Sequence, residues 1–276
     1  YLKLRASYGE LGNDQVFYNG SLQEFAYLST FGFGEYPIDS NVVKTLYETV
    51  LPNPNFTWEV ARNTNIGIDT KLFNRVNLTL EWFNNQRDRI LIQQQGSTPD
   101  SSGIASLLPP TNFGSMTNSG YEFNIAYSGG DSNYSNPNGF RYTVGLNGGY
   151  SKNEIEFIDE VSGAPEWQLQ EGKPLGAYLL YETDGVFYDQ SEIDANAVDY
   201  SQVTPQLRPG DLRLVDYDGN GKIDADDQVR QEDSFTPRLQ YGITLDMSYK
   251  NFDLSILFQG SQGGLTTLFN GEFGDW

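Results

Sequence analysis

The chain has 276 residues and a formal net charge of −20, from 37 acidic and 17 basic side chains. This charge argues against nucleic acid or anionic lipid headgroups as the main partner. Cysteine and histidine are both absent, which excludes disulfides and thiolate sites and removes the commonest general base at neutral pH, so we expect no enzyme.

Alternation of apolar and polar residues is the main local signal along the chain. In residues 76–82, Val76, Leu78, Leu80 and Trp82 share one face, and polar residues occupy the other. The same two-residue period recurs in segments from the start of the chain to residue 262. No stretch approaches the roughly 20 consecutive apolar residues that a membrane-spanning helix needs. The pattern predicts an all-β chain of about seven strands, at 1–9, 58–72, 75–93, 114–129, 139–157, 235–249 and 251–262.

The connections between these predicted strands alternate strictly between short and long. Turns at 72–76, 129–139 and 249–252 are short, whereas the connections at 10–57, 94–112 and 158–234 are long and carry little sustained periodicity. Every long loop therefore falls at one end of the sheet. Outer-membrane barrels have this asymmetry, with short periplasmic turns and long extracellular loops. Since seven strands cannot close such a barrel, we expect the missing wall to come from sequence outside this chain.

The longest loop contains a segment with the spacing of a calcium-binding loop, residues 216–227. Oxygen ligands fall at its positions 1, 3, 5, 9 and 12, glycine stands at position 6, and position 7 offers a backbone carbonyl. The predicted metal ligands are Asp216, Asp218, Asn220, the backbone carbonyl of Lys222, Asp224 and Asp227. Asp227 is shorter than the usual bidentate glutamate, so the loop predicts weak calcium binding or magnesium binding. The alternative is an acidic turn that holds no ion.

No second group of residues carries comparable chemistry. Pro209, Gly210 and Pro237 interrupt the flanks of the acidic loop, which predicts a structural clip and not a regulatory helix pair. Paired carboxylates such as Glu154 and Glu156 have nothing that places them across a cleft. Trp167, in the long loop, is a weak candidate for stacking on a ligand.

Several segments in succession resemble the C-terminal half of the SusC/RagA family of TonB-linked outer-membrane proteins of Bacteroidetes. Their order and spacing match that family along essentially the whole chain. They are LKLRASYGELGN at 2–13, PNPNFTWE at 52–59, NIGIDTKLFNRVNLTLEWF at 65–83, NFGSMTNSGYEF at 112–123, EGKPLGAYLLYETDGVFYD at 171–189, PGDLRLVDYDGNGKIDADDQV at 209–229 and FDLSILFQGSQGG at 252–264.

The resemblance implies a partial wall of a 22-stranded transmembrane β-barrel in the outer membrane, filled by an N-terminal plug. It also implies energy coupling through TonB, a SusD-like surface lipoprotein as lid, and import of oligosaccharides or peptides. We expect the plug and the last strands to lie outside residues 1–276, lipid to contact the outward strand faces, and loop 158–234 to contact the lid.

Two other classes of protein share parts of this pattern. A secreted or surface β-sandwich that binds carbohydrate, stapled by a calcium loop, would bury the apolar strand faces against each other. A passive porin-like barrel would have the same wall without a plug or TonB box. The inward residues are generic amides, hydroxyls and charges, so the sequence does not identify the substrate.

Overall fold

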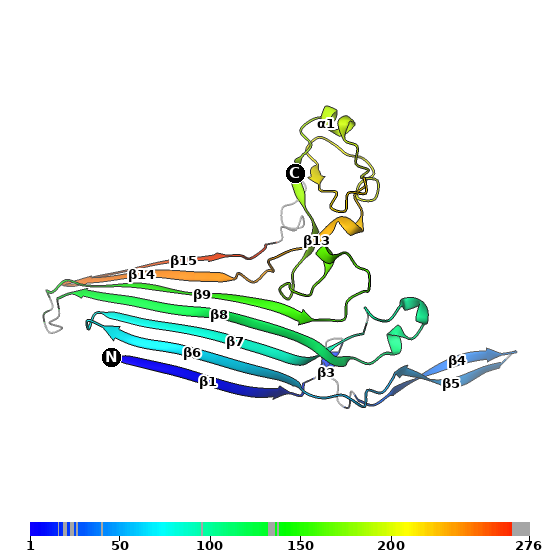
Figure 1. Cartoon of the computed structure of the whole chain (residues 1–276), viewed down its shortest axis with the longest axis horizontal. Helices are drawn as coiled ribbons and strands as arrows, with labels where there is room; N and C mark the ends of the chain where they lie inside the picture. The colour runs from blue at the N-terminus through cyan, green and yellow to red at the C-terminus, as the bar shows by residue number, and fades with distance from the viewer. Residues whose placement is uncertain are drawn as a thin grey trace.

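Seven long strands form one antiparallel sheet in the computed structural model of the chain (Figure 1). The structure describes residues 1–266 apart from 16, 19–20, 23–24, 26, 40, 95, 132–135 and 137. The sheet order is β1-β6-β7-β8-β9-β14-β15. The strand bounds are β1 Leu2–Asn13, β6 Glu59–Leu72, β7 Val76–Ile92, β8 Thr111–Gly130, β9 Arg141–Phe157, β14 Leu239–Tyr249 and β15 Phe252–Gln262. The expected all-β architecture is confirmed, and the sheet is an open wall, not a closed barrel.

The strand register gives the sheet one apolar and one polar face. Leu4 pairs with Ile68, which pairs with Leu80, so apolar side chains form a continuous row across neighbouring strands. One residue further along, Arg5 pairs with Gly67, which pairs with Glu81 on the opposite face. Because successive side chains of a strand point to opposite faces, the alternation in the sequence becomes an apolar outer and a polar inner surface.

The apolar face of this sheet is not covered by a second sheet within the described residues. Leu4 is 70% exposed and Phe258 is 64% exposed, and both belong to the outer face. The remaining sheets of the described chain have two strands each and lie in the connections. The β-sandwich alternative is therefore wrong, because a sandwich buries such a face against a second sheet.

Short turns occupy one end of the sheet and long connections the other, as Figure 1 shows. Phe73 and Asn74 join β6 to β7 with φ angles of 52° and 56°. Two successive positive φ angles characterise the hairpin turn whose twist matches the strands it joins. Lys250, between β14 and β15, also has a positive φ, of 55°.

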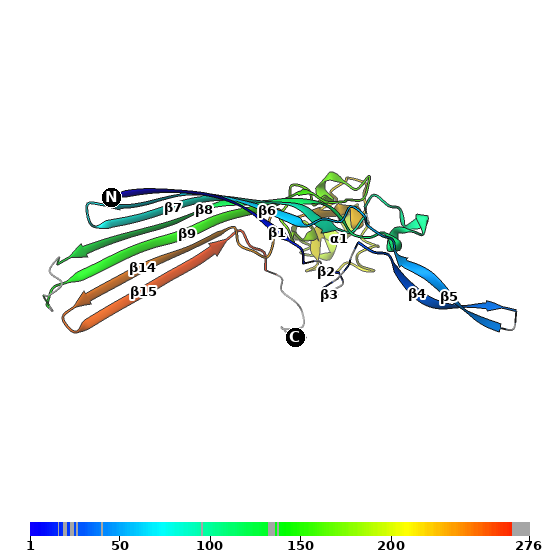
Figure 2. The ribbon, with the colours of Figure 1, turned by 90° about the horizontal axis from the view of Figure 1, so that it is seen from below.

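The connection 10–57 contains regular structure where the sequence predicts none. Strand β1 continues to Asn13, the short strands β2 (Phe17–Tyr18) and β3 (Ser21–Leu22) follow, and β4 (Thr30–Ile38) and β5 (Asn41–Val50) form a long hairpin. Figures 1 and 2 both show this hairpin projecting beyond the long-connection end of the wall. The alternation of Phe31 and Phe33 with glycines was the available signal, and the glycine-rich composition obscured it.

The connection after β7 holds two short 3-10 helices, η1 (Asp100–Ser102) and η2 (Ala105–Leu107). One carboxylate oxygen of Asp159 accepts hydrogen bonds from the backbone N–H of Gly96 and of Ser97, at 2.9 and 3.1 Å. A side chain at position 96 would meet the backbone of Glu160 at about 2.2 Å, so only glycine allows this approach. The connection after β7 is thus attached to the one after β9.

The connection after β9 folds into a small unit of its own. Its elements are η3 Glu166–Gln168, β10 Leu179–Tyr181, β11 Thr183–Val186, α1 Gln190–Ala195, β12 Leu212–Leu214, η4 Ala225–Asp227 and β13 Gln228–Arg230. Phe187, Tyr200 and Ile223 form its buried core. Asp189 caps the N-terminus of α1 by accepting a hydrogen bond from the Glu192 N–H. Within the described residues, no helix has the length and apolar character to cross a membrane.

Candidate functional site

The acidic loop 216–227 is held at both ends and in its middle. It connects β12, which pairs with β11, to β13, which pairs with β10. In its middle, Ile223 is fully buried against Phe187 and Tyr200. Burial of this one apolar side chain fixes the position of an otherwise polar loop. The burial stabilises the connection by about 1.5–3 kcal/mol for a residue of this size.

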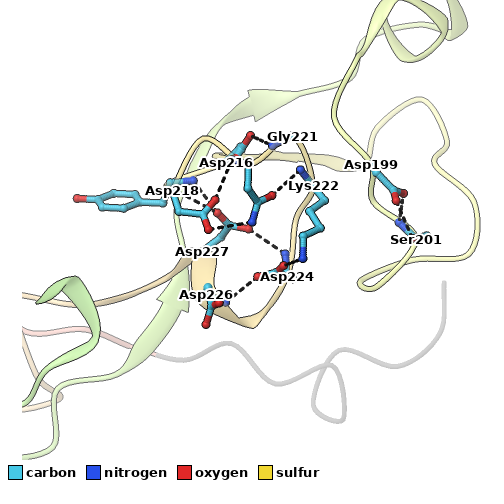
Figure 3. A network of polar contacts seen from close by, with 11 residues as sticks. Asp199, Ser201, Asp216, Asp218, Gly221, Lys222, Asp224, Asp226 and Asp227 are labelled. Carbon is cyan, nitrogen blue, oxygen red and sulfur yellow. Dashed lines mark hydrogen bonds and ion pairs between the residues drawn. The ribbon is translucent and has the colours of Figure 1, made fainter. Parts of the chain in front are cut away.

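Three of the predicted ligands converge in space (Figure 3). Asp216, Asp218 and Asp227 each place a carboxylate oxygen so that the three oxygens lie within 4.8 Å of one another. Asp227 is fully buried, whereas Asp218 is exposed. Three converging carboxylate oxygens suit a hard divalent cation. The residues present therefore fit calcium or magnesium at the point where these three carboxylates meet.

Backbone N–H groups orient these carboxylates. The two oxygens of Asp216 accept hydrogen bonds from the N–H groups of Asn220 and Gly221, at 3.1 and 2.8 Å. Those of Asp227 accept from Tyr217 and Asp224, at 2.7 and 2.8 Å, and the first of them also accepts a longer bond from the Asp218 N–H, at 3.4 Å. Since each carboxylate oxygen has two lone pairs, these bonds leave acceptor capacity for a cation. The sharp turn at Gly221 has a φ of 84°, which glycine adopts without strain.

The other predicted ligands have different partners. The Asn220 side chain donates to Asp218 at 2.8 Å, and its carbonyl oxygen accepts from the Lys222 N–H at 2.9 Å. The Asp224 carboxylate pairs with the Lys222 ammonium at 2.5 Å, away from the three converging oxygens. The full set of side-chain ligands predicted from spacing is therefore not brought together in this arrangement.

The backbone of Lys222 is positioned by a bridge to Asp199. The Gly221 carbonyl accepts from the Asp199 N–H, and the Asp199 carbonyl accepts from the Ile223 N–H. In such a bridge the N–H and carbonyl of the central residue, Lys222, point to the opposite side. On that side the Lys222 N–H donates to the Asn220 side chain, and the Lys222 carbonyl as a ligand stays a prediction.

The ion pair in this loop shifts the pKa values of both partners. The hydrogen bond with Lys222 lowers the pKa of Asp224 from its ordinary value, with a further contribution from the Asp226 N–H. The hydrogen bond with Asp224 in turn raises the pKa of Lys222. At neutral pH the Lys222 ammonium is thus ion-paired with the Asp224 carboxylate.

Trp167 lies against the acidic loop. Its indole N–H donates to the Asp226 carbonyl at 2.7 Å, and its ring lies 5.2 Å from the Tyr217 ring. Gln168 makes a parallel contact with the Ala225 carbonyl, also at 2.7 Å. These contacts attach η3 to the loop. Ligand stacking on Trp167 stays a prediction.

Tyr200 is a structural residue of this site that sequence reasoning missed. Its hydroxyl accepts from the Leu214 N–H at 2.9 Å and donates to the Leu214 carbonyl at 3.1 Å, at the start of the acidic loop. A single tyrosine among 18 carries no local signal for such a contact. Its place depends on the fold of the whole connection.

We expect alkaline pH to loosen this connection through Tyr200. Burial raises the pKa of Tyr200 above its ordinary value of 10.0. The Tyr200 hydroxyl therefore ionises at a lower pH in the unfolded connection than in the folded one. Its contribution to the stability of the folded connection is complete below pH 10 and is lost as the pH rises through the folded pKa. The hydrogen-exchange protection factors of residues 212–227 should therefore fall as the pH rises above 10. The Tyr200→Phe variant should lack this alkaline loss, and an identical loss in that variant would contradict the assignment.

The inner face of the wall has its own charge arrangement. Arg5 pairs with Asp69 at 2.9 Å and reaches across β6 to Glu81 at 3.0 Å. A side chain at position 67 would meet the Arg5 guanidinium at about 2.9 Å, so Gly67 leaves the room for this crossing. The face is hollowed by a concavity of about 1000 Å³, whose lining includes Glu122 and Gln240. This polar hollow can take hydrogen-bonding groups of a passing solute.

Comparison with protein families gives one match over nearly the whole chain. The family model described as "TonB dependent receptor-like, beta-barrel" matches residues 1–271. TonB-dependent receptors P3 and P26 of Formosa agariphila are 29% and 30% identical over 275 and 279 residues. TonB-dependent receptor SusC of Bacteroides thetaiotaomicron is 25% identical over 281 residues. The chain covers 25–26% of these three relatives, so it spans about a quarter of their length.

Solved structures show the same fold. The RagAB peptide importer in its "open-open" state matches with a TM-score of 0.64 and 19% identity, over 95% of this chain and 26% of that one. Its "closed-closed" state matches with a TM-score of 0.60 and 21% identity, over 95% and 27%. Identities this low support the architecture of the wall and no finer property.

Proposed function

Because this chain belongs to the TonB-dependent receptor-like β-barrel family, we propose that it forms wall, cavity lining and docking surface of an importer for oligosaccharides or peptides. Its place is the cell outer membrane, and its relatives are receptors and not enzymes. The single observation that carries the proposal is the two-faced sheet with long connections at one end. An apolar outer face suits lipid, and a polar hollow inner face suits a hydrated solute.

Substrate and partner are proposed from the likeness to SusC and to the RagAB peptide importer. The proposed partner is a SusD-like surface lipoprotein, and the proposed energy source is TonB acting on sequence outside these residues. Glu122, Asn124 and Gln240 provide carboxylate and amide groups on the inner face, which serve either hydroxyl-rich or peptide substrates. The chemistry of the wall thus favours polar substrates.

For the acidic loop we propose a bound divalent cation, calcium or magnesium. Asp216, Asp218 and Asp227 would hold it through carboxylate oxygens, and the Lys222 backbone carbonyl is proposed as a further ligand. The cation would neutralise part of the acidic loop and fasten β12 to β13. Its role here is to order the connection.

The connections after β1 and β9 are the proposed contact surfaces for the lipoprotein. Loop 158–234 is folded around its own core and so offers a defined surface. The hairpin β4–β5 stands out at the same end and exposes Phe33 (84%) and Leu46 (60%), which lie opposite each other on one face. Apolar side chains that lie together on one exposed face suit a contact with a protein partner.

Uptake by bacteria that carry the full-length protein tests this function. Deletion of the full-length gene is expected to abolish growth on one class of polymer, oligosaccharide or peptide, and restoration of growth should require an intact TonB system. Growth on monosaccharides and free amino acids is the control. Rescue by a protein whose TonB contact has been removed would favour the passive porin-like alternative and contradict the proposal.

A test of the contact surface compares two variants of the full-length protein. The double variant Phe33→Ser and Leu46→Ser should reduce co-purification of the lipoprotein. The variant Phe73→Ser, at the opposite end of the wall, should leave co-purification of the lipoprotein unchanged. Equal recovery of the lipoprotein with both variants would exclude the hairpin as a contact.

A further inference from the structure

The short-turn end of the wall carries a net positive charge, opposite in sign to the net charge of the whole chain. We define the short-turn rim as residues 71–75, 127–131, 140–142 and 249–253. It holds four cationic and two acidic side chains, in a chain whose net charge is −20. The cationic residues are Lys71, Arg75, Arg141 and Lys250. A local positive strip at one end of an acidic protein points to an anionic partner at that end.

Two of these cations stand on the membrane side of the sheet. Tyr127 pairs with Val76, so its ring lies on the apolar outer face, and its hydroxyl is hydrogen-bonded to Arg75. The Tyr249 ring lies on the same face, and the Lys250 ammonium sits 5.1 Å from its centre. By the same register, Lys71 and Arg141 occupy inward positions. Arg75, at the Tyr127 hydroxyl, and Lys250, over the Tyr249 ring, therefore lie at the edge of the apolar belt.

An exposed phenylalanine accompanies each of these cations. Phe73 is 90% exposed and has a φ of 52°, a conformation in which a bulky side chain is strained by roughly 1–2 kcal/mol. Phe252, next to the Lys250 turn, is 79% exposed. Asparagine or glycine would form the Phe73 turn without this strain. A phenylalanine at such a position is favourable when its ring enters the boundary between acyl chains and headgroups.

We propose that Arg75 and Lys250 bind the phosphate groups of phospholipids in the periplasmic leaflet, with Phe73 and Phe252 inserted beside them. The short turns of outer-membrane barrels face that leaflet. Phosphate is the anion present there on every phospholipid, and it forms charge-assisted hydrogen bonds with guanidinium and ammonium groups. A soluble anion would give no reason for the two exposed rings, whereas a lipid contacts the cations and the rings together.

Native mass spectrometry of the full-length protein in detergent, titrated with phosphatidylglycerol, tests the headgroup contact. The double variant Arg75→Gln and Lys250→Gln should bind the lipid about tenfold more weakly, from the loss of charge-assisted hydrogen bonds. The matched control is Lys44→Gln with Arg208→Gln, which removes two exposed cations at the long-connection end. An equal loss in both double variants would reduce the effect to overall charge and overturn the proposal.

The variant Phe73→Asn separates a lipid contact from a turn-forming role. Asparagine relieves the strained backbone, so the folded wall should be equally or more resistant to heat on electrophoresis. Lipid binding should nevertheless weaken. Unchanged lipid binding in Phe73→Asn, or complete displacement of phosphatidylglycerol by inorganic phosphate, would show an ordinary anion site and contradict insertion of the ring.

Discussion

Replacing Asp227 with alanine is expected to open the acidic loop. The carboxylate is fully buried and accepts hydrogen bonds from the Tyr217 and Asp224 N–H groups. Its loss leaves one buried and one partly buried donor without partners, at about 1–3 kcal/mol each. The connection should lose roughly 2–6 kcal/mol of local stability. The rate of limited proteolysis within residues 216–227 of the full-length protein measures this, and it should rise at least about thirtyfold.

The neighbouring Asp226 provides a matched control. Its side chain is exposed, so Asp226→Ala removes the same group from the same turn and should leave the cleavage rate within about twofold of the wild-type rate. Chelation of divalent cations should raise cleavage of the wild-type loop and add little in Asp227→Ala. If chelation changes nothing in the wild type while Asp227→Ala is cleaved rapidly, Asp227 is structural and the cation proposal is wrong.

An arginine at position 243 is expected to destabilise the wall in a bilayer. Ile243 lies midway along β14, on the apolar outer face, and pairs with Leu146 and Phe258. A cation on the lipid face near the midplane costs about 2–4 kcal/mol. The equilibrium constant for folding of the full-length protein into phospholipid vesicles should fall by about thirtyfold or more, measured by urea titration with heat-dependent migration on electrophoresis as the readout of folding.

The adjacent position distinguishes the lipid face from the inner face. Thr244 pairs with Gly145 and Leu257 and points to the inner side of the wall. Thr244→Arg should fold to within about 0.5 kcal/mol of the wild type, because its side chain enters the hydrated hollow. Equal losses at positions 243 and 244 would contradict the assignment of the faces.

The sequence was sufficient for the architecture of the wall. Alternation along β7 and β14 assigns each side chain to a face, because the two-residue period is a property of the extended backbone itself. The contrast between short and long connections, visible in turn residues such as Asn74 and Asn251, was sufficient to separate the two ends of the sheet. Spacing alone also identified Asp216, Asp218 and Asp227 as neighbours, since a tight turn at Gly221 brings them together locally.

The tertiary structure decided which distant groups meet. Asp224 pairs with Lys222 instead of joining the three carboxylates, Trp167 packs on Tyr217 from about fifty positions away, and Asp159 holds the Gly96 turn. Such contacts depend on how long connections close and on which buried groups find partners, and neither has a period in the sequence. Position on the wall is thus a local property of the chain. The partners of the loop residues are a property of the folded connection.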